Sequence, residues 1–171
     1  DQATAGYVDY GFNNRLKYSF NDNLQGVLGL QNITYHDNSD VVYGMLSDEV
    51  ASNGLYGELR FSSDAFVQTN ISIAGRQDFN NAFEDQSIWK YGIRQDLPGG
   101  FYVRSNGGTS YSAPTISEAG FVKGRVNNPN LETQQVESYS FGAGIDGEAF
   151  GGTFNIEVGA FDTTIDNQFG A

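Results

Sequence analysis

The chain has 171 residues and a formal net charge of −12. A chain this acidic is repelled by nucleic acid, so nucleic acid is excluded as a partner. Cysteine is absent, which excludes a disulfide scaffold and a thiolate metal site. The composition has 22 Gly, 13 Phe and 10 Tyr against one Met, and no stretch has a helical period. It therefore favours strands with one apolar and one wet face over a helical or α/β domain.

Alternating apolar and polar residues, in segments of roughly ten, predict about eight β-strands along the chain. In the last segment Phe154, Ile156 and Val158 share one face, and Asn155 and Glu157 share the other. A soluble β-sandwich also alternates in this way, so the alternation does not by itself define the fold. The expected strands span residues 11–20, 24–35, 54–62, 65–78, 87–97, 100–110, 133–147 and 151–165.

The connections between these strands alternate in length. Short links are expected at 21–23, 63–64, 98–99 and 148–150, and longer ones at about 36–53, 79–86 and 111–132. Short turns at one end and long loops at the other, on strands of nine or more residues, are typical of a membrane-spanning antiparallel β-barrel. The long loops are expected outside the cell and the short turns in the periplasm.

Aromatic residues lie where the two interfaces of a membrane would place them. Six are beside the short turns: Tyr18, Phe20, Phe61, Phe66, Phe101 and Phe154. Trp89 and Tyr139 lie toward the opposite end. The pattern predicts two aromatic girdles around an apolar band.

Seven of the nine basic residues fall in expected strands, each on the face opposite the aliphatic residues. They are Arg15, Lys17, Arg60, Arg76, Lys90, Arg94 and Arg104. A cation on the lipid face near the bilayer midplane costs about 2–4 kcal/mol, which drives these side chains inward. The sequence therefore predicts a polar, charged lumen behind an outward face nearly free of charge.

The segment from residue 101 to 167 resembles one family in four separate pieces. Residues 101–118, with Arg104-Ser105-Asn106-Gly107 and Ala113-Pro114-Thr115, are similar to the "R-x-S-x-G-x-x-F/Y-R-A-P-T-x-x-E" stretch of TonB-dependent outer-membrane receptors. Residues 128–135 resemble "G-N-P-x-L-x-P-E-x-S", residues 136–142 the following "E-x-G" strand, and residues 161–167 "F-x-x-x-I-D-N". The departures are Ser112 in place of Arg, Asn127 in place of Gly, and Gln134-Gln135 in place of Pro-Glu.

The resemblance implies a 22-stranded barrel in the bacterial outer membrane, closed by an N-terminal plug and driven by the inner-membrane TonB complex. Such receptors import ferric siderophores, cobalamin or saccharides, and a ferric siderophore is the substrate we expect. The chain itself is expected to be a partial barrel domain over residues 1–171, an internal piece of the wall without the plug. The implied partners are outer-membrane lipid, the plug of the same parent chain, the TonB complex indirectly, and a small-molecule ligand.

No catalytic constellation, cofactor site or metal site is expected. The sole histidine, His36, is interpreted as a residue at a strand-to-loop junction, and Asp37-Asn38-Ser39-Asp40 as a solvated loop whose spacing is not that of an EF-hand. Ligand contacts are expected in the outer loops, from aromatic and cationic side chains suited to an anionic chelate: Tyr111, Phe121, Lys123 and Arg125. Arg60, Arg76, Lys90, Arg94 and Arg104 are expected to face the lumen or the plug.

Two other functions remain open at this point. A passive outer-membrane pore or a small closed β-barrel would use the same lumen charges to tune ion flow. A soluble β-sandwich binding module would show the same alternation of residues without a membrane.

Overall fold

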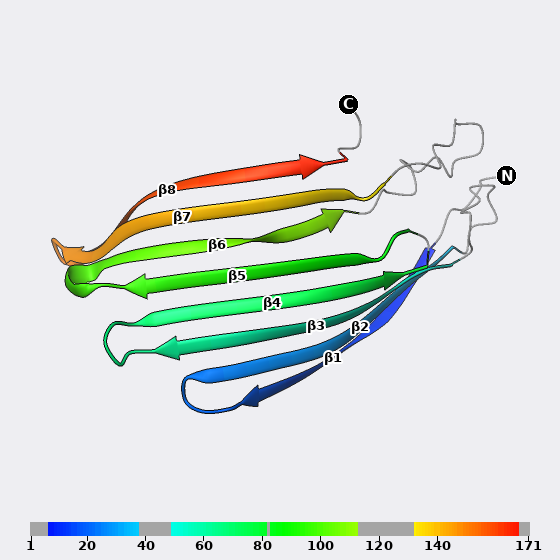
Figure 1. Ribbon diagram of the computed structural model, residues 1–171, viewed down its shortest axis with the longest axis horizontal. Helices are drawn as coiled ribbons and strands as arrows, with labels where there is room; N and C mark the ends of the chain where they lie inside the picture. The colour runs from blue at the N-terminus through cyan, green and yellow to red at the C-terminus, as the bar shows by residue number, and fades with distance from the viewer. Residues whose placement is uncertain (1–6, 38–48, 82, 113–131, 168–171) are drawn as a thin grey trace.

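The computed structural model describes residues 7–37, 49–81, 83–112 and 132–167, which form one eight-stranded antiparallel sheet (Figure 1). Each strand pairs with its neighbours in the sequence, in the order β1 to β8. The strands are β1 (Tyr7–Ser19), β2 (Leu24–Asp37), β3 (Glu49–Ser63), β4 (Thr69–Asn80), β5 (Gln86–Asp96), β6 (Phe101–Ser112), β7 (Gln134–Ala149) and β8 (Gly152–Asp166), with one 3-10 turn, η1 (Pro98–Gly100), before β6. The predicted all-β, up-and-down fold with eight strands is confirmed.

The strands are long, from 11 residues in β5 to 16 in β7. About 9–11 residues of tilted strand suffice to cross the hydrocarbon core of a bilayer. The links β1–β2, β3–β4, β5–β6 and β7–β8 share one end of the sheet (Figure 1, left). The expected alternation of length fails at one place, because the β3–β4 link (64–68) and the β4–β5 link (81–85) are equally long. No helix in the described ranges is long and apolar enough to cross a membrane.

Two of the short turns show the local chemistry that ends each strand. In the β1–β2 turn, the Asn21 side-chain oxygen accepts hydrogen bonds from the backbone N–H groups of Asn23 (2.9 Å) and Leu24 (2.8 Å). In the β7–β8 turn, Phe150 and Gly151 both have positive φ, at 54° and 81°. Two such residues make the tight turn whose twist matches the flanking strands, so the loop is Phe150-Gly151 rather than the expected 148–150.

Several strand boundaries differ from those expected. β1 begins at Tyr7 rather than 11, and β3 at Glu49 rather than 54, because the β1–β2 and β2–β3 ladders continue toward the long loops. β4 begins at Thr69 rather than 65, since the β3–β4 ladder closes at the pair Ser63 and Thr69. Phe66 therefore lies in a five-residue turn with 98% of its surface exposed, and not in a strand.

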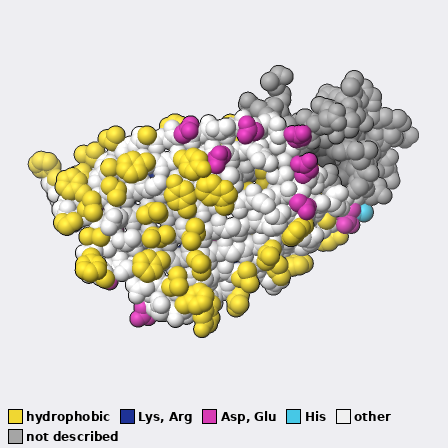
Figure 2. Space-filling model, viewed as in Figure 1, with side chains coloured by type: hydrophobic (Ala, Val, Ile, Leu, Met, Phe, Trp, Pro, Cys, Tyr) yellow, Lys and Arg dark blue, Asp and Glu magenta, His cyan; other side chains and the backbone are white. Residues whose placement is uncertain are grey.

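The two faces of the sheet differ sharply in chemistry. The apolar face carries exposed aliphatic and aromatic side chains, and no Lys or Arg is visible on it (Figure 2). Near the short turns the rings of Tyr18 and Phe20 meet edge to face at 5.0 Å. Toward the other end Trp89 lies 6.1 Å from Tyr139. Acidic residues on this face, among them Glu137, Asp162 and Asp166, lie toward the long-loop end of β7 and β8.

The described part of the chain is a single layer. Its one buried hydrophobic residue is Tyr102, with 2% exposure, and no second sheet covers the apolar face. A sandwich buries its inner faces against each other, so the described sheet is not a soluble β-sandwich. β1 and β8 lie at opposite edges and do not pair within the described sheet, so a closed eight-stranded barrel is not formed either (Figure 1).

We predict that residues 1–171 expressed alone aggregate instead of inserting into a membrane. The edges of β1 and β8 leave backbone N–H and C=O groups unpaired, which lipid does not tolerate. Electrophoresis of the refolded chain with and without heating measures this. Recovery of a heat-modifiable, detergent-stable monomer would contradict it and would indicate closure of the eight strands.

Candidate functional site

The face opposite the aliphatic residues carries all seven strand cations. Residues paired directly across an antiparallel ladder share a face. Arg15 is connected in this way through Gly29 and Tyr56 to Arg76, and Lys17 is connected through Val27, Glu58 and Ala74 to Lys90. Arg94 pairs with Arg104, and Arg60 lies in the adjoining row opposite Ser72. This polar face is the candidate functional surface of the chain.

Three of these cations are paired with a carboxylate two residues away on their own strand. Period-two alternation puts such residues on one face. Arg60 lies 2.6 Å from Glu58, Arg76 lies 2.6 Å from Asp78, and Arg94 lies 2.8 Å from Asp96. The guanidinium groups therefore lie along their strands in fixed positions, although exposed pairs of this kind contribute little stability.

Other polar side chains reach across one strand to the next but one. On β6, Arg104 Nε donates to Glu157 Oε2 of β8 at 2.8 Å, and the Tyr102 hydroxyl donates to the same oxygen at 2.8 Å. On β5, Arg94 pairs with Asp146 of β7 at 2.8 Å, and its guanidinium carbon lies 4.0 Å from the centre of the Tyr102 ring. These contacts join β5 through β8 into one network.

Glycines in β7 make room for this network. A Cβ added at Gly144 would lie 2.5 Å from Cζ of Tyr102, and one added at Gly142 would lie 3.0 Å from Oε1 of Glu157. Both distances are too short for an ordinary contact, so a larger residue would displace the ring or the ion pair. The Tyr102 ring therefore packs directly against the backbone at Gly144, and the Arg104–Glu157 pair packs against the backbone at Gly142.

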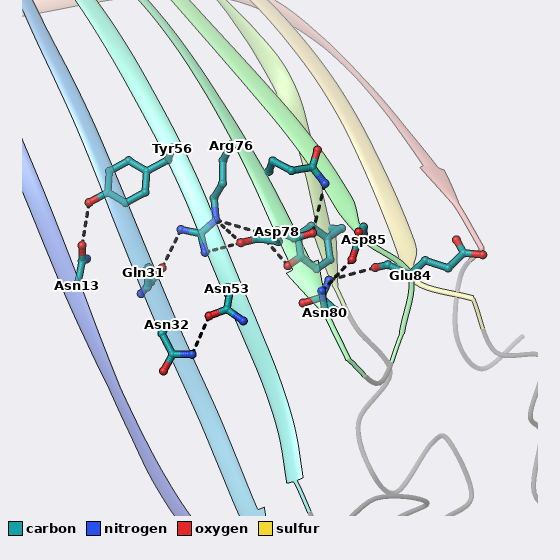
Figure 3. Close-up of polar contacts among 12 residues, drawn as sticks. Asn13, Gln31, Asn32, Asn53, Tyr56, Arg76, Asp78, Asn80, Glu84 and Asp85 are labelled. Atoms are coloured by element: carbon teal, nitrogen blue, oxygen red, sulfur yellow. Dashed lines mark hydrogen bonds and ion pairs between the residues drawn. The ribbon is translucent and has the colours of Figure 1, made fainter.

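A second network occupies β1 to β6 nearer the long loops (Figure 3). Arg76 Nη1 donates to the Gln31 side chain of β2 at 2.7 Å, passing over β3 at Gly54, where a Cβ would meet the guanidinium at 2.4 Å from Nη2. Asp78, which is 2% exposed, accepts from Arg76 at 2.8 Å and from the Tyr111 hydroxyl at 3.0 Å. Links from β2 and from β6 thus meet on β4.

Two neighbouring hydrogen bonds also cross one intervening strand. The Tyr56 hydroxyl of β3 donates to Asn13 of β1 at 2.8 Å, above Gly29 of β2 (Figure 3). The buried side chain of Gln86 on β5 donates to Thr133 Oγ1, just before β7, at 2.8 Å. Sequence reasoning missed Asp78, Gln86 and Thr133, because the contacts that join them to other strands, Asp78 with Tyr111 and Gln86 with Thr133, span more than 30 residues of sequence.

Toward the short turns the polar face is hollowed. A shallow depression of about 540 Å³ is lined by three of the predicted lumen cations, Arg60, Arg94 and Arg104. The rest of its lining includes the acidic residues Asp22 and Glu58 and small or amide residues such as Ser72 and Asn106. Arg76 and Lys90 are outside this depression. The structure thus brings together three of the five cations and places Arg76 in the network nearer the long loops.

The residues predicted to contact ligand are placed only in part. Tyr111 was expected in an outer loop, but it lies in β6, which runs on to Ser112, and its hydroxyl is bonded to Asp78. Phe121, Lys123 and Arg125 lie outside the described residues. His36 lies near the end of β2, paired with Val8 and Glu49 in the two ladders. In the described ranges no group of three or more His, Cys, Asp and Glu could hold a metal ion.

Comparison with known proteins agrees with this geometry. The model of the family described as "TonB dependent receptor-like, beta-barrel" matches residues 1–171, the whole chain, so the chain belongs to the TonB-dependent receptor barrel family of the bacterial outer membrane. The chain is also similar to the vitamin B12 transporter BtuB of Vibrio vulnificus (strain CMCP6), with 27% identity over 133 residues. That match covers 71% of this chain and 20% of the transporter, so the chain spans about a fifth of its curated relative.

Membership of this family confirms two predictions from the sequence: the resemblance to TonB-dependent receptors and the location in the outer membrane. Barrels of the outer membrane have an apolar band on one face of the wall and polar residues on the other, as the two faces of this sheet do. The family and the relative are a receptor and a transporter, which agrees with a non-enzymatic role.

We predict that Gly144→Val in the full-length protein containing this segment lowers the stability of the barrel by about 1–3 kcal/mol, the usual effect of overpacking. The valine would displace the Tyr102 ring from its place over β7 and break its bond to Glu157. The midpoint of urea unfolding measures the effect. Gly57→Val is the matched control, since a Cβ there meets nothing closer than 3.7 Å, and an equal loss in both variants would contradict the role of Gly144.

Proposed function

We propose that the chain forms about a third of the wall of a 22-stranded barrel, in a receptor that uses TonB to import a scarce nutrient. The match of the barrel family to all 171 residues is the observation that carries this proposal. The eight long strands, the two unpaired edges and the separation of an apolar from a charged face support it. No step of the proposed role is catalytic.

The proposed partners follow from the two faces. Outer-membrane lipid contacts the apolar face, and the plug of the same parent chain contacts the polar face, where Arg60, Arg94 and Arg104 line the depression. Arg76 and Lys90 face the same interior nearer the outside. The TonB complex acts indirectly, through the plug and not through this wall.

A small-molecule nutrient is the proposed cargo. A ferric siderophore is the first candidate, with Lys123 and Arg125 binding an anionic chelate and Tyr111 and Phe121 presenting aromatic rings. Cobalamin is the second candidate, because the similar protein is named as a vitamin B12 transporter.

Uptake by cells that produce the full-length protein tests this proposal. We expect accumulation of labelled ferric siderophore or labelled cobalamin, and loss of that accumulation when TonB is deleted or the proton-motive force is collapsed. Steady single-channel conductance with no need for energy would indicate a passive pore instead.

The loop residues are tested by the double variant Lys123→Ala/Arg125→Ala. Each lost charge-assisted bond is expected to weaken binding of an anionic chelate about tenfold. Lys123→Arg keeps the charge and is the matched control. Unchanged siderophore binding in the double variant would contradict the role of these two residues. Uptake of cobalamin without any binding of ferric siderophore would replace the first candidate with the second.

A further inference from the structure

Two adjacent glycines on the apolar face have no side chain above them. Gly57 of β3 and Gly75 of β4 are directly paired in the ladder. A Cβ at Gly57 would come no closer than 3.7 Å to another residue, and one at Gly75 no closer than 4.0 Å. Elsewhere on this face glycines are covered by rings, since a Cβ at Gly107 would lie 2.6 Å from Tyr139 and one at Gly147 would lie 2.5 Å from Phe154.

Backbone geometry does not require glycine at these two positions. Neither residue is among the described glycines with positive φ, and the β3–β4 ladder runs without interruption from Ser52 and Asn80 to Ser63 and Thr69. Glycine inside a strand is destabilising, and where no bulge or bend explains it, it often marks the close approach of another molecule. The pair Gly57–Gly75 therefore indicates a contact that the sheet itself does not supply.

The two glycines lie in the floor of a shallow groove of about 480 Å³. Leu28, Leu59 and Ile73 flank it, and Tyr18 and Phe20 close it near the β1–β2 turn. Glu58 also lines the groove, but its side chain belongs to the opposite, polar face, because Glu58 pairs with Val27 and Ala74 in the row of Lys17 and Lys90.

We propose that this groove is a binding site for one acyl chain of a phospholipid, held against the backbone of β3 and β4. This inference rests on the proposed function, which places the apolar face against outer-membrane lipid, and the groove interrupts that face. Its side chains offer apolar contact and no charged group, which suits an acyl chain. The Tyr18–Phe20 pair lies beside a short turn, at headgroup depth on the periplasmic side, so the lipid belongs to the inner leaflet.

Native mass spectrometry of the full-length protein with added phosphatidylethanolamine tests the site. Gly57→Leu and Gly75→Leu extend a side chain into the groove, and at both positions the added Cβ has space in the described sheet. We expect the wild-type protein to retain a lipid, and each variant to bind it about tenfold more weakly, equivalent to about 1.4 kcal/mol. Ala143→Leu adds the same side chain to the apolar face of β7, outside the groove, and should retain lipid as the wild type does.

A phosphatidylethanolamine with a photoreactive acyl chain provides a second test on the unaltered protein. Cross-links should concentrate in peptides that carry Leu16 to Leu28 and Leu59 to Ile73. Equal retention of lipid by wild type and both groove variants, or cross-links spread evenly over the apolar face, would overturn the proposal. The proposal would also be overturned if the lipid probe does not label the groove because another protein occupies it. None of these outcomes depends on which nutrient the receptor imports.

Discussion

The polar face of this wall depends on side chains that cross one strand to bond the next but one. Arg104 and Tyr102 reach Glu157 across β7, Arg76 reaches Gln31 across β3, and Tyr56 reaches Asn13 across β2. The strand that is crossed carries glycine below several of these contacts, because any Cβ would occupy the space of the bridging group. Backbone ladders join only neighbouring strands, so these bridges couple strands that the ladders leave unconnected.

Glycines have a different role on each face of the sheet. On the polar face Gly54, Gly142 and Gly144 lie beneath ion pairs or a phenol ring, so the charged groups can approach one another directly above the backbone. On the apolar face rings cover Gly107 and Gly147, while Gly57 and Gly75 stay open. Glycine thus makes room for a polar network on one face and leaves the backbone of β3 and β4 open on the other, where we propose that an acyl chain binds.

The sequence predicts the local features of this fold well. Period-two alternation places Arg60 and Arg94 on the polar face and Trp89 on the apolar one, since the face of a strand residue depends on its immediate neighbours. The pairing of Arg104 with Glu157 could not be predicted, because it depends on the register of three strands across 53 residues of sequence. Tyr111 was expected in a loop because a proline follows it closely, but its bond to Asp78 keeps it at the end of β6.

The central claim is that one face of the sheet meets lipid and the other meets a polar interior. Because this chain has no cysteine, single cysteines can be placed at successive positions of β3 in the full-length protein and spin-labelled in membranes. Collision with oxygen, which concentrates in lipid, should be high at Leu55, Leu59 and Phe61, and low at Glu58 and Arg60. Similar oxygen and water accessibility at all five positions, with no period of two, would contradict the account.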